Sequence, residues 1–386
     1  MKTLYVYPWD LQDEEPGEVI RNAQMGRINM LSMASIYHTG RFLLPHNPRQ
    51  KVYIPEDGVI YFSPRKGKYS KRIPRAGVLA RKNILGKTIN LLREKGMKSR
   101  SWVVCLHNSN LGRKNRGWTI ENAFGDNNFT SLCPANQEVL TYFQEIFRDL
   151  LEQYQFDWVE LESFEYAKFQ HGYHHEKTGI FLDDMDSFLL SLCFCPSCRE
   201  KMKAWGVDTE AIREQVKKML DKRFADPRVR NEKEVQTQLA VFKEENRRFI
   251  EGRQSIVSEF VEKIVDSVRA VSDTKVLLLY RYNYSQAWLS GIDPQKLAKT
   301  IDRWMVQGYF ERTEKIKERL LPFLTAFPVN QLEVGLNVCY PFVKEKEDIK
   351  EDIATLDHLG INNLSFYNYG FIPLRNLEWI GEAMKR

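Results

Sequence analysis

A chain of 386 residues with 43% hydrophobic and 28% charged side chains is ordinary for a globular protein, and its length suits one large α/β barrel or two domains. The net charge is +6, and no apolar run approaches the length of a membrane-spanning helix. The first residues lead directly into a predicted strand rather than a signal peptide, and six unevenly spaced cysteines do not suit a disulfide scaffold. We therefore expect a cytoplasmic protein with reduced thiols that does not bind a membrane.

Basic residues are concentrated in one predicted loop, at positions Arg65, Lys66, Lys68, Lys71, Arg72 and Arg75. Runs of this kind bind nucleic acid in some proteins, but more of them form solvated surface loops. We expect no nucleic-acid partner, and the sequence leaves a homo-oligomer open.

Short β-rich stretches alternate with amphipathic helical stretches, which is the pattern of a parallel sheet with crossover helices. The eight predicted strands cover residues 3–9, 28–36, 101–106, 156–163, 275–280, 303–309, 332–338 and 363–367. Helical sequence follows each strand, and the long loop after the second strand contains a predicted hairpin at 52–62. This order predicts a single (β/α)8 TIM barrel over residues 1–386, with an open doubly wound sheet as the alternative.

The helix signals are clearest in the first half of the chain. A helix is predicted to start at Pro16, a second to cover 75–95, and a third to cover 137–154 with Asn136 as its N-cap. After the fourth strand the alternation stops. Residues 166–250 are predicted to be a largely helical insertion with three histidines and a cysteine cluster, and a helix over 235–271 returns to the barrel.

The active site of such a barrel is expected at the C-terminal ends of its strands. Polar and aromatic residues gather at these ends, so we predict a polar pocket with an aromatic rim that holds a hydroxylated ligand. The predicted substrate-binding residues are Asp10, His38, His107, Asn108, Glu160, Arg281, Tyr309, Tyr340, Tyr367 and Asn368.

Two carboxylates of the fourth strand are predicted to face the barrel interior. Glu160 and Glu162 share a face because side chains alternate along a strand. Buried carboxylates are costly unless they are compensated or used. Glu160 lies deeper and fits a structural salt bridge, for example with Arg281 or Arg312, whereas Glu162 lies nearer the ligand. Glu165 lies beyond the strand, where a solvated loop residue is equally expected.

Glu311 is the predicted partner of Glu162. It is the last residue of the sixth strand's inward face, at the barrel mouth. Glycoside hydrolysis needs two carboxyl groups that flank the scissile bond, and the ends of strands four and six could supply them. The alternative for Glu311 is a position in the first turn of the next helix, where an acid favours the helix dipole.

The segment DWVELESF at 157–164 resembles the fourth-strand signature of barrel glycoside hydrolases and their uncharacterised relatives. Segments LCPANQEV at 132–139 and CFCPSC at 193–198 also resemble the flanking segments of such proteins. The resemblance implies a sugar-active barrel with Glu162 in the place of the family carboxylate. Two departures matter: Phe164 stands where chitinase-like barrels carry Glu, and the seventh strand ends in Asn337, Cys339 and Tyr340 rather than a carboxylate. A pairing of strands four and six therefore fits better.

The cysteines Cys193, Cys195 and Cys198 have a C-x-C-x-x-C spacing. A C-x-x-C turn places two thiolates on one Zn²⁺, and the remaining ligands would be Cys193 or one of His171, His174 and His175. The alternative is a set of reduced thiols that pack the start of a helix at Pro196. We expect no required catalytic cofactor and keep structural zinc as one of the two interpretations of the cluster.

These patterns predict a glycosidase, an O-glycosyl hydrolase that cleaves an oligosaccharide or glycoside with Glu162 and Glu311 as the catalytic pair. One alternative is a metal-dependent sugar isomerase or epimerase, in which Glu162 would bind the metal with histidines from His38, His46, His107, His171, His174 and His175. Another is a carbohydrate-binding barrel without catalysis. In each case the expected partner is a carbohydrate.

Overall fold

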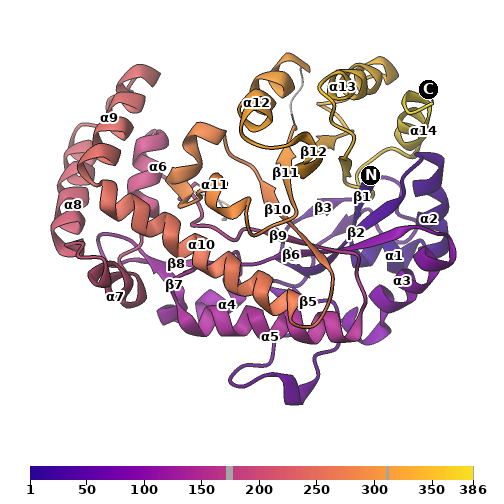
Figure 1. Ribbon diagram of the computed structural model, residues 1–386, viewed down its shortest axis with the longest axis horizontal. Coiled ribbons are helices and arrows are strands. Elements are labelled where there is room, and N and C mark those ends of the chain that lie inside the picture. The colour runs from indigo at the N-terminus through magenta and orange to yellow at the C-terminus, as the bar shows by residue number, and fades with distance from the viewer. Residues whose placement is uncertain (171–176, 310–312, 386) are drawn as a thin grey trace.

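The computed structural model describes residues 1–170, 177–309 and 313–385 (Figure 1). Eight parallel strands form the central barrel, and β1 pairs with both β2 and β13, which closes the ring. In order around the barrel they are β1 (Lys2–Val6), β2 (Met30–Tyr37), β6 (Lys98–Val104), β9 (Trp158–Glu162), β10 (Lys275–Tyr280), β11 (Arg303–Gln307), β12 (Leu332–Asn337) and β13 (Leu364–Tyr367). The prediction of a single (β/α)8 barrel is confirmed.

Helices surround the barrel, as Figure 1 shows. Each helix packs an apolar face against the sheet. The strands are therefore buried both toward the helices and toward the barrel interior, which explains their continuous apolar runs. The surrounding helices are α2 (Pro16–Met25), α3 (Ile84–Glu94), α5 (Gln137–Gln153), α10 (Arg247–Arg269), α12 (Thr313–Ala326), α13 (Lys346–His358) and α14 (Leu374–Ala383). After β10 the chain instead forms a 3-10 segment (Tyr284–Ser290) and the short α11 (Pro294–Leu297).

Local signals set the start of two helices. Pro16 occupies the first turn of α2, and the Asn136 side chain accepts hydrogen bonds from Glu138 N and Val139 N at the start of α5. Helix α3 begins at Ile84 rather than near residue 75. The chain before it is held against the sheet instead, because Gly77 N donates to the Ile60 carbonyl.

The loop after β2 contains a hairpin, but at a different place from the one predicted. Strands β3 (Phe42–Leu43) and β4 (Val52–Tyr53) pair with each other. Strand β5 (Val59–Ile60) pairs antiparallel with β2 and extends the sheet. The hairpin therefore lies over residues 42–53. The residues of β5, which were expected to form its second strand, pair with β2 instead.

The chain between β9 and α10 forms a group of helices beside the barrel, on the left of Figure 1. They are α6 (Asp184–Ser191), α7 (Pro196–Ala204), α8 (Thr209–Ala225) and α9 (Glu232–Glu245). The helix expected over 235–271 is divided into α9 and α10 at Asn246, whose side chain donates to the Phe242 carbonyl. A second hairpin, β7 (Thr119–Glu121) with β8 (Asn127–Leu132), precedes α5 and contacts this group.

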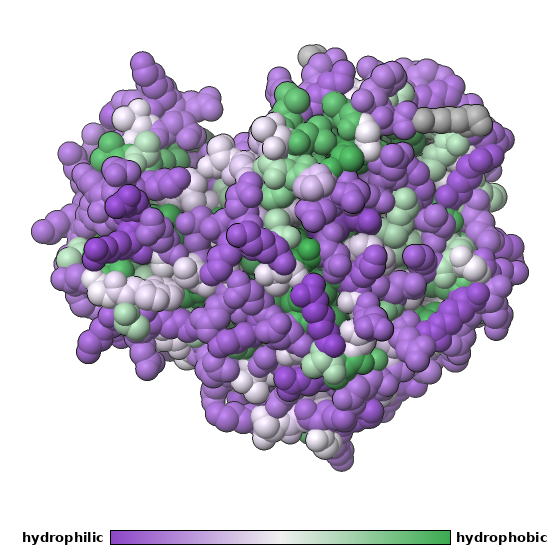
Figure 2. Space-filling model, in the orientation of Figure 1, coloured by the Kyte–Doolittle hydropathy of each residue, from purple (hydrophilic) through white to green (hydrophobic). Residues whose placement is uncertain are grey.

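The basic loop that follows β5 lies against acidic residues of α5. Arg65 Nε is 2.6 Å from Asp149 Oδ1, and Lys71 pairs with Glu138. The local excess of positive charge is thus matched by carboxylates of this chain. Figure 2 shows a mainly hydrophilic face with smaller apolar areas between the helices. Among the described residues, every helix is too short or too polar to cross a membrane.

Candidate active site at the barrel mouth and a cysteine cluster beside it

Glu162 is the last residue of β9 and is held by residues of the two neighbouring strands. Trp102 Nε1, from β6, donates a hydrogen bond of 2.6 Å to Glu162 Oε2. Arg281 Nη2, just beyond β10, donates one of 2.7 Å to Oε1. The Glu162 side chain is 13% exposed, so the ion pair is largely shielded from water but the carboxylate remains accessible from the mouth.

Glu160 lies two residues below Glu162, inside the barrel and without exposed surface. Tyr5 Oη donates to its Oε1 at 2.6 Å, and Arg100 Nη1 lies 3.0 Å from its Oε2. Burial raises the pKa of Glu160 to about 7, and Arg100 opposes this shift. Because Arg100 also binds Glu333 at 2.7 Å, these three charges form a buried structural network. These contacts fit the interpretation of Glu160 as a structural salt-bridge residue. Its partner is Arg100, whereas Arg281, which was expected to pair with it, binds Glu162.

Glu165 follows a sharp turn at Ser163, whose φ of 53° lies in the left-handed region. Glu165 is 4% exposed, and Tyr282 Oη donates to its Oε1 at 3.0 Å. Within the described residues its Oε2 accepts no hydrogen bond. Burial raises the pKa of Glu165, while Arg281 lowers it. The sequence alone could not show that Glu165 is buried rather than solvated. Its hydrogen-bond partner Tyr282 lies 117 positions further along the chain.

Aromatic side chains surround the mouth next to Glu162. Tyr7 Oη lies 2.9 Å from Tyr37 Oη and 2.8 Å from Tyr367 Oη, which links the ends of β1, β2 and β13. The Trp102 ring lies 5.0 Å from that of Tyr37, and Tyr309 lies 5.6 Å from Tyr367. The predicted residues Tyr309 and Tyr367 are therefore brought together, whereas Tyr7 and Trp102 were missed because they read as ordinary core residues.

His38 and His107 also come together at the mouth. Their rings are stacked, with centroids 4.5 Å apart and an interplanar angle of 7°. His38 Nδ1 lies 2.7 Å from the Thr39 carbonyl, and burial lowers the pKa of His38, which favours a neutral imidazole. Asn108 is buried and accepts a hydrogen bond from Leu111 N as the N-cap of α4 (Ser109–Lys114).

Three other predicted residues have different surroundings. Asp10, in α1 (Pro8–Asp13), has no exposed surface, and its Oδ2 accepts the Tyr7 N–H at 2.9 Å. Asn368 is also fully buried and accepts the Gly370 N–H. Tyr340 is 80% exposed. The structure thus places the first two inside the protein and the third in solvent.

Glu311 and Arg312, together with His171, His174 and His175, lie outside the described residues. The pairing of Glu311 with Glu162 stays a prediction, as does histidine ligation of a metal.

A cavity of about 830 Å³ lies at the opposite end of the barrel, lined in part by Lys98, Asp157, Trp158, Lys275 and Arg303. These residues begin or precede their strands. Active sites of (β/α)8 enzymes lie at the other face, and the N-terminal face serves stability. We therefore keep the candidate active site at Glu162.

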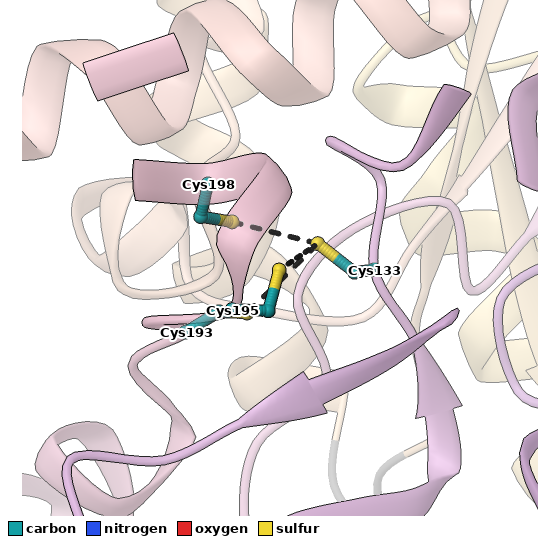
Figure 3. A group of neighbouring side chains, drawn as sticks. All are labelled: Cys133, Cys193, Cys195 and Cys198. Carbon is teal, nitrogen blue, oxygen red and sulfur yellow. Dashed lines mark hydrogen bonds between the residues drawn. The ribbon is translucent and has the colours of Figure 1, made fainter. Parts of the chain in front are cut away.

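Four cysteines form a second centre, shown in Figure 3. The predicted Cys193, Cys195 and Cys198 are joined by Cys133, and one ligand atom from each lies within 4.8 Å of the other three. Cys133 Sγ is 3.4 Å from Cys198 Sγ and 3.6 Å from Cys195 Sγ. Sequence reasoning missed Cys133 as a cluster member because 60 residues separate it from Cys193. The one feature of the sequence that pointed to Cys133 was its segment, 132–139, which resembles a segment next to the fourth strand in barrel glycoside hydrolases.

The sequence matches no protein-family model and no curated protein. The fold, however, is similar to several solved structures. The α-L-fucosidase isoenzyme 2 from Paenibacillus thiaminolyticus aligns with a TM-score of 0.60 at 12% identity, over 99% of this chain and 48% of that chain. The PgaB (BpsB) glycoside hydrolase domain from Bordetella bronchiseptica aligns with a TM-score of 0.59 at 15% identity, over 95% of this chain and 93% of that chain.

A β-galactosidase from Marinomonas ef1 aligns with a TM-score of 0.56 at 11% identity, over 95% of this chain. This chain spans about half the length of the fucosidase and of the β-galactosidase, at 48% and 54%, but nearly all of the PgaB domain. At these identities the likeness concerns the fold. The chain therefore has the (β/α)8 barrel fold that is also found in these glycoside hydrolases.

Proposed function

We propose that this protein is a glycoside hydrolase that cleaves an oligosaccharide or glycoside, with Glu162 as one of its two catalytic carboxylates. The observation that carries the proposal is the position of Glu162. It ends β9 at the C-terminal face, is partly exposed, and is fixed by Trp102 and Arg281. The solved structures with a similar fold include an α-L-fucosidase, a glycoside hydrolase domain and a β-galactosidase, which supports the same reaction class.

The ion pair suits a carboxylate that acts in its charged form. Arg281 compensates the negative charge of Glu162 in a site with little water. A charged carboxylate attacks the anomeric carbon in a retaining mechanism or activates water in an inverting one. Either role requires a second carboxyl group that protonates the leaving oxygen.

Two residues are candidates for that second carboxyl group. Glu311 is the partner predicted from strand order, and we retain it as the proposed partner. Glu165 is the alternative, because burial raises its pKa and a general acid must keep its proton at the working pH.

The aromatic side chains would bind the sugar. Tyr37, Tyr309 and Tyr367 combine ring faces with hydroxyl groups at the mouth, and the neutral His38 can exchange hydrogen bonds with substrate hydroxyls. This arrangement supports a carbohydrate as the ligand and leaves the identity of the sugar to experiment.

The test is a screen of aryl glycosides, followed by the variants Glu162→Gln, Glu165→Gln and Glu311→Gln on whichever substrate is cleaved. We expect Glu162→Gln to reduce kcat by about 10²–10⁴-fold. Of the other two, the true partner should show a loss of that size. Glu152→Gln, on the outer surface of the barrel, is the matched control and should keep full activity. Full activity of Glu162→Gln would contradict the proposal, as would sugar binding by calorimetry without turnover of any substrate.

A further inference from the structure

The spacing of the four cysteine sulfurs matches the coordination sphere of one metal ion. A tetrahedral Zn²⁺ with Zn–S bonds of about 2.3 Å separates its sulfurs by roughly 3.8 Å. From Cys133 Sγ, the distances to Cys198, Cys195 and Cys193 are 3.4, 3.6 and 3.9 Å. Figure 3 shows the Cys133 side chain turned toward Cys195 and Cys198, with Cys193 behind Cys195. All four residues are free and buried.

The geometry differs from that of a disulfide pair. A disulfide needs sulfurs about 2.05 Å apart, well below the shortest of these distances. A cluster of several iron atoms would also separate the four sulfurs further than the 4.8 Å within which they lie. The space between them accommodates a single ion.

A buried cation beside the cluster is the second, independent observation. Arg253 is 1% exposed and donates one hydrogen bond, from Nη1 to the Leu289 carbonyl. Its Nε and Nη2 have no hydrogen-bond partner among the described residues. Burying an unpaired guanidinium in this way is costly unless negative charge lies nearby.

The cluster supplies that negative charge if its sulfurs are thiolates. Burial lowers the pKa of Arg253, and Tyr166, Cys198 and Cys193 act against this shift. The guanidinium also lies over the ring of Tyr166, 4.7 Å from its centroid. With four neutral thiols, the charge of Arg253 would be compensated only by the rings of Tyr166 and Phe188 and by the Leu289 carbonyl. Four thiolates on one Zn²⁺ carry a net charge of −2, which a neighbouring Arg⁺ stabilises.

We propose that Cys133, Cys193, Cys195 and Cys198 bind one Zn²⁺ as four thiolates, that Arg253 is its buried counter-charge, and that the metal fixes Tyr166, four residues beyond the end of β9. With four protein ligands the site is closed, so the metal is structural rather than catalytic.

The four ligands come from two separate parts of the chain. Cys133 follows the β7–β8 hairpin, whereas the other three stand at the start of α7 within the insertion. A backbone hydrogen bond from Phe194 N to the Glu121 carbonyl crosses the same junction. The metal would therefore hold the helical insertion against the hairpin that precedes α5.

Tyr166 connects the cluster to the barrel mouth. Its Oη lies 3.2 Å from Cys198 Sγ, where a thiolate would accept the hydroxyl proton in a hydrogen bond. Its backbone N–H donates to the Ser290 carbonyl. Tyr166 directly follows Glu165, so a metal that fixes Tyr166 also fixes the position of Glu165. This last step rests on the proposed function; metal binding itself does not.

Metal content is the first test. The full chain is purified under reducing conditions, and its metal is measured by mass spectrometry. We expect one zinc per chain, and replacement by Co²⁺ should give the absorption spectrum of tetrahedral thiolate coordination. Cys133→Ser should lose the metal, while Cys105→Ser, which removes a buried cysteine outside the cluster, should keep it. Iron in place of zinc, a disulfide, or four free thiols without metal would overturn the proposal.

The second test does not depend on folding of the cysteine variants. A chelator competition on the wild-type protein gives the zinc affinity, and Arg253→Met should weaken it by about tenfold, which corresponds to about 1.4 kcal/mol. Tyr166→Phe should keep the zinc but increase hydrogen exchange of the segment after β9. Unchanged affinity in Arg253→Met would refute the counter-charge. Because neither measurement uses turnover, a failure of the proposed function would leave both results interpretable.

Discussion

Arg281 Nη2 lies 2.7 Å from Glu162 Oε1, and the two side chains come from the ends of adjacent strands, β10 and β9. Arg281 also donates to Ser163 Oγ at 3.2 Å, at the turn that leads to Glu165. One guanidinium thus holds the carboxylate and the turn that follows it. The position of Glu162 depends on a residue almost 120 positions later in the chain.

Removing Arg281 should destabilise the protein because Glu162 then loses the cation that compensates its charge. Arg281→Met leaves a largely shielded carboxylate without its cation, and we expect the free energy of unfolding to fall by about 2–3 kcal/mol. Glu162→Gln removes the charge that Arg281 compensates. In the double variant the two losses should not add, and the interaction energy should be about 1–3 kcal/mol. Urea denaturation of the four proteins measures this cycle, and strict additivity would show that the pair contributes nothing.

The indole N–H of Trp102 should matter for activity rather than for packing alone. Trp102→Phe keeps a ring but loses the 2.6 Å hydrogen bond to Glu162 Oε2, which is worth about 1.5–3 kcal/mol for a charged acceptor. We expect kcat on a cleaved glycoside to fall by about 10–100-fold.

Trp304→Phe is the matched control for this variant. Trp304 is equally buried and packs on Tyr280, but its Nε1 has no hydrogen-bond partner among the described residues. It should keep nearly wild-type kcat. Equal losses in the two variants would mean that ring packing, and not the hydrogen bond to Glu162, explains the effect.

The strands could be predicted from sequence because their apolar runs and flanking turn residues are local signals. Strand β10 was predicted with its observed bounds, and the others within a few residues. The cap at Asn136 was also local, since an Asx side chain needs only the N–H groups two and three residues ahead. The start of α3 was wrong because the residues before Ile84 bond to β5, and a helical pattern in sequence does not reveal such a competing partner.

The candidate site was only partly predictable for a similar reason. Strand alternation placed Glu160 inside the barrel and Glu162 at the mouth. It could not identify Arg100 as the partner of Glu160, because that contact depends on the register between β6 and β9. Cys133 is separated from its partners along the chain by α5, β9 and α6. Only tertiary structure brings such residues within contact distance.

Asp10 should make the stability of the protein depend on pH. It has no exposed surface, and burial raises its pKa from 3.8 to about 7, while the Tyr7 N–H opposes this shift. The folded state therefore holds a proton that the unfolded state releases between these two values. Stability from this group is complete below about pH 4 and is lost as the pH rises to about 7, with a slope of at most about 1.4 kcal/mol per pH unit.

Asp10→Asn removes this ionisation and can still accept the Tyr7 N–H through its amide oxygen. Urea denaturation between about pH 5 and about pH 7.5 should therefore give a flatter dependence of the free energy of unfolding on pH than in the wild type. Glu160, whose pKa burial also raises to about 7, keeps its own contribution in this variant. Glu160→Gln should flatten the curve in the same direction, and the double variant should flatten it more. An Asp10→Asn curve as steep as that of the wild type would contradict the assignment, because the difference between the two curves isolates the contribution of Asp10 from that of groups such as His38, whose lowered pKa acts in the opposite direction.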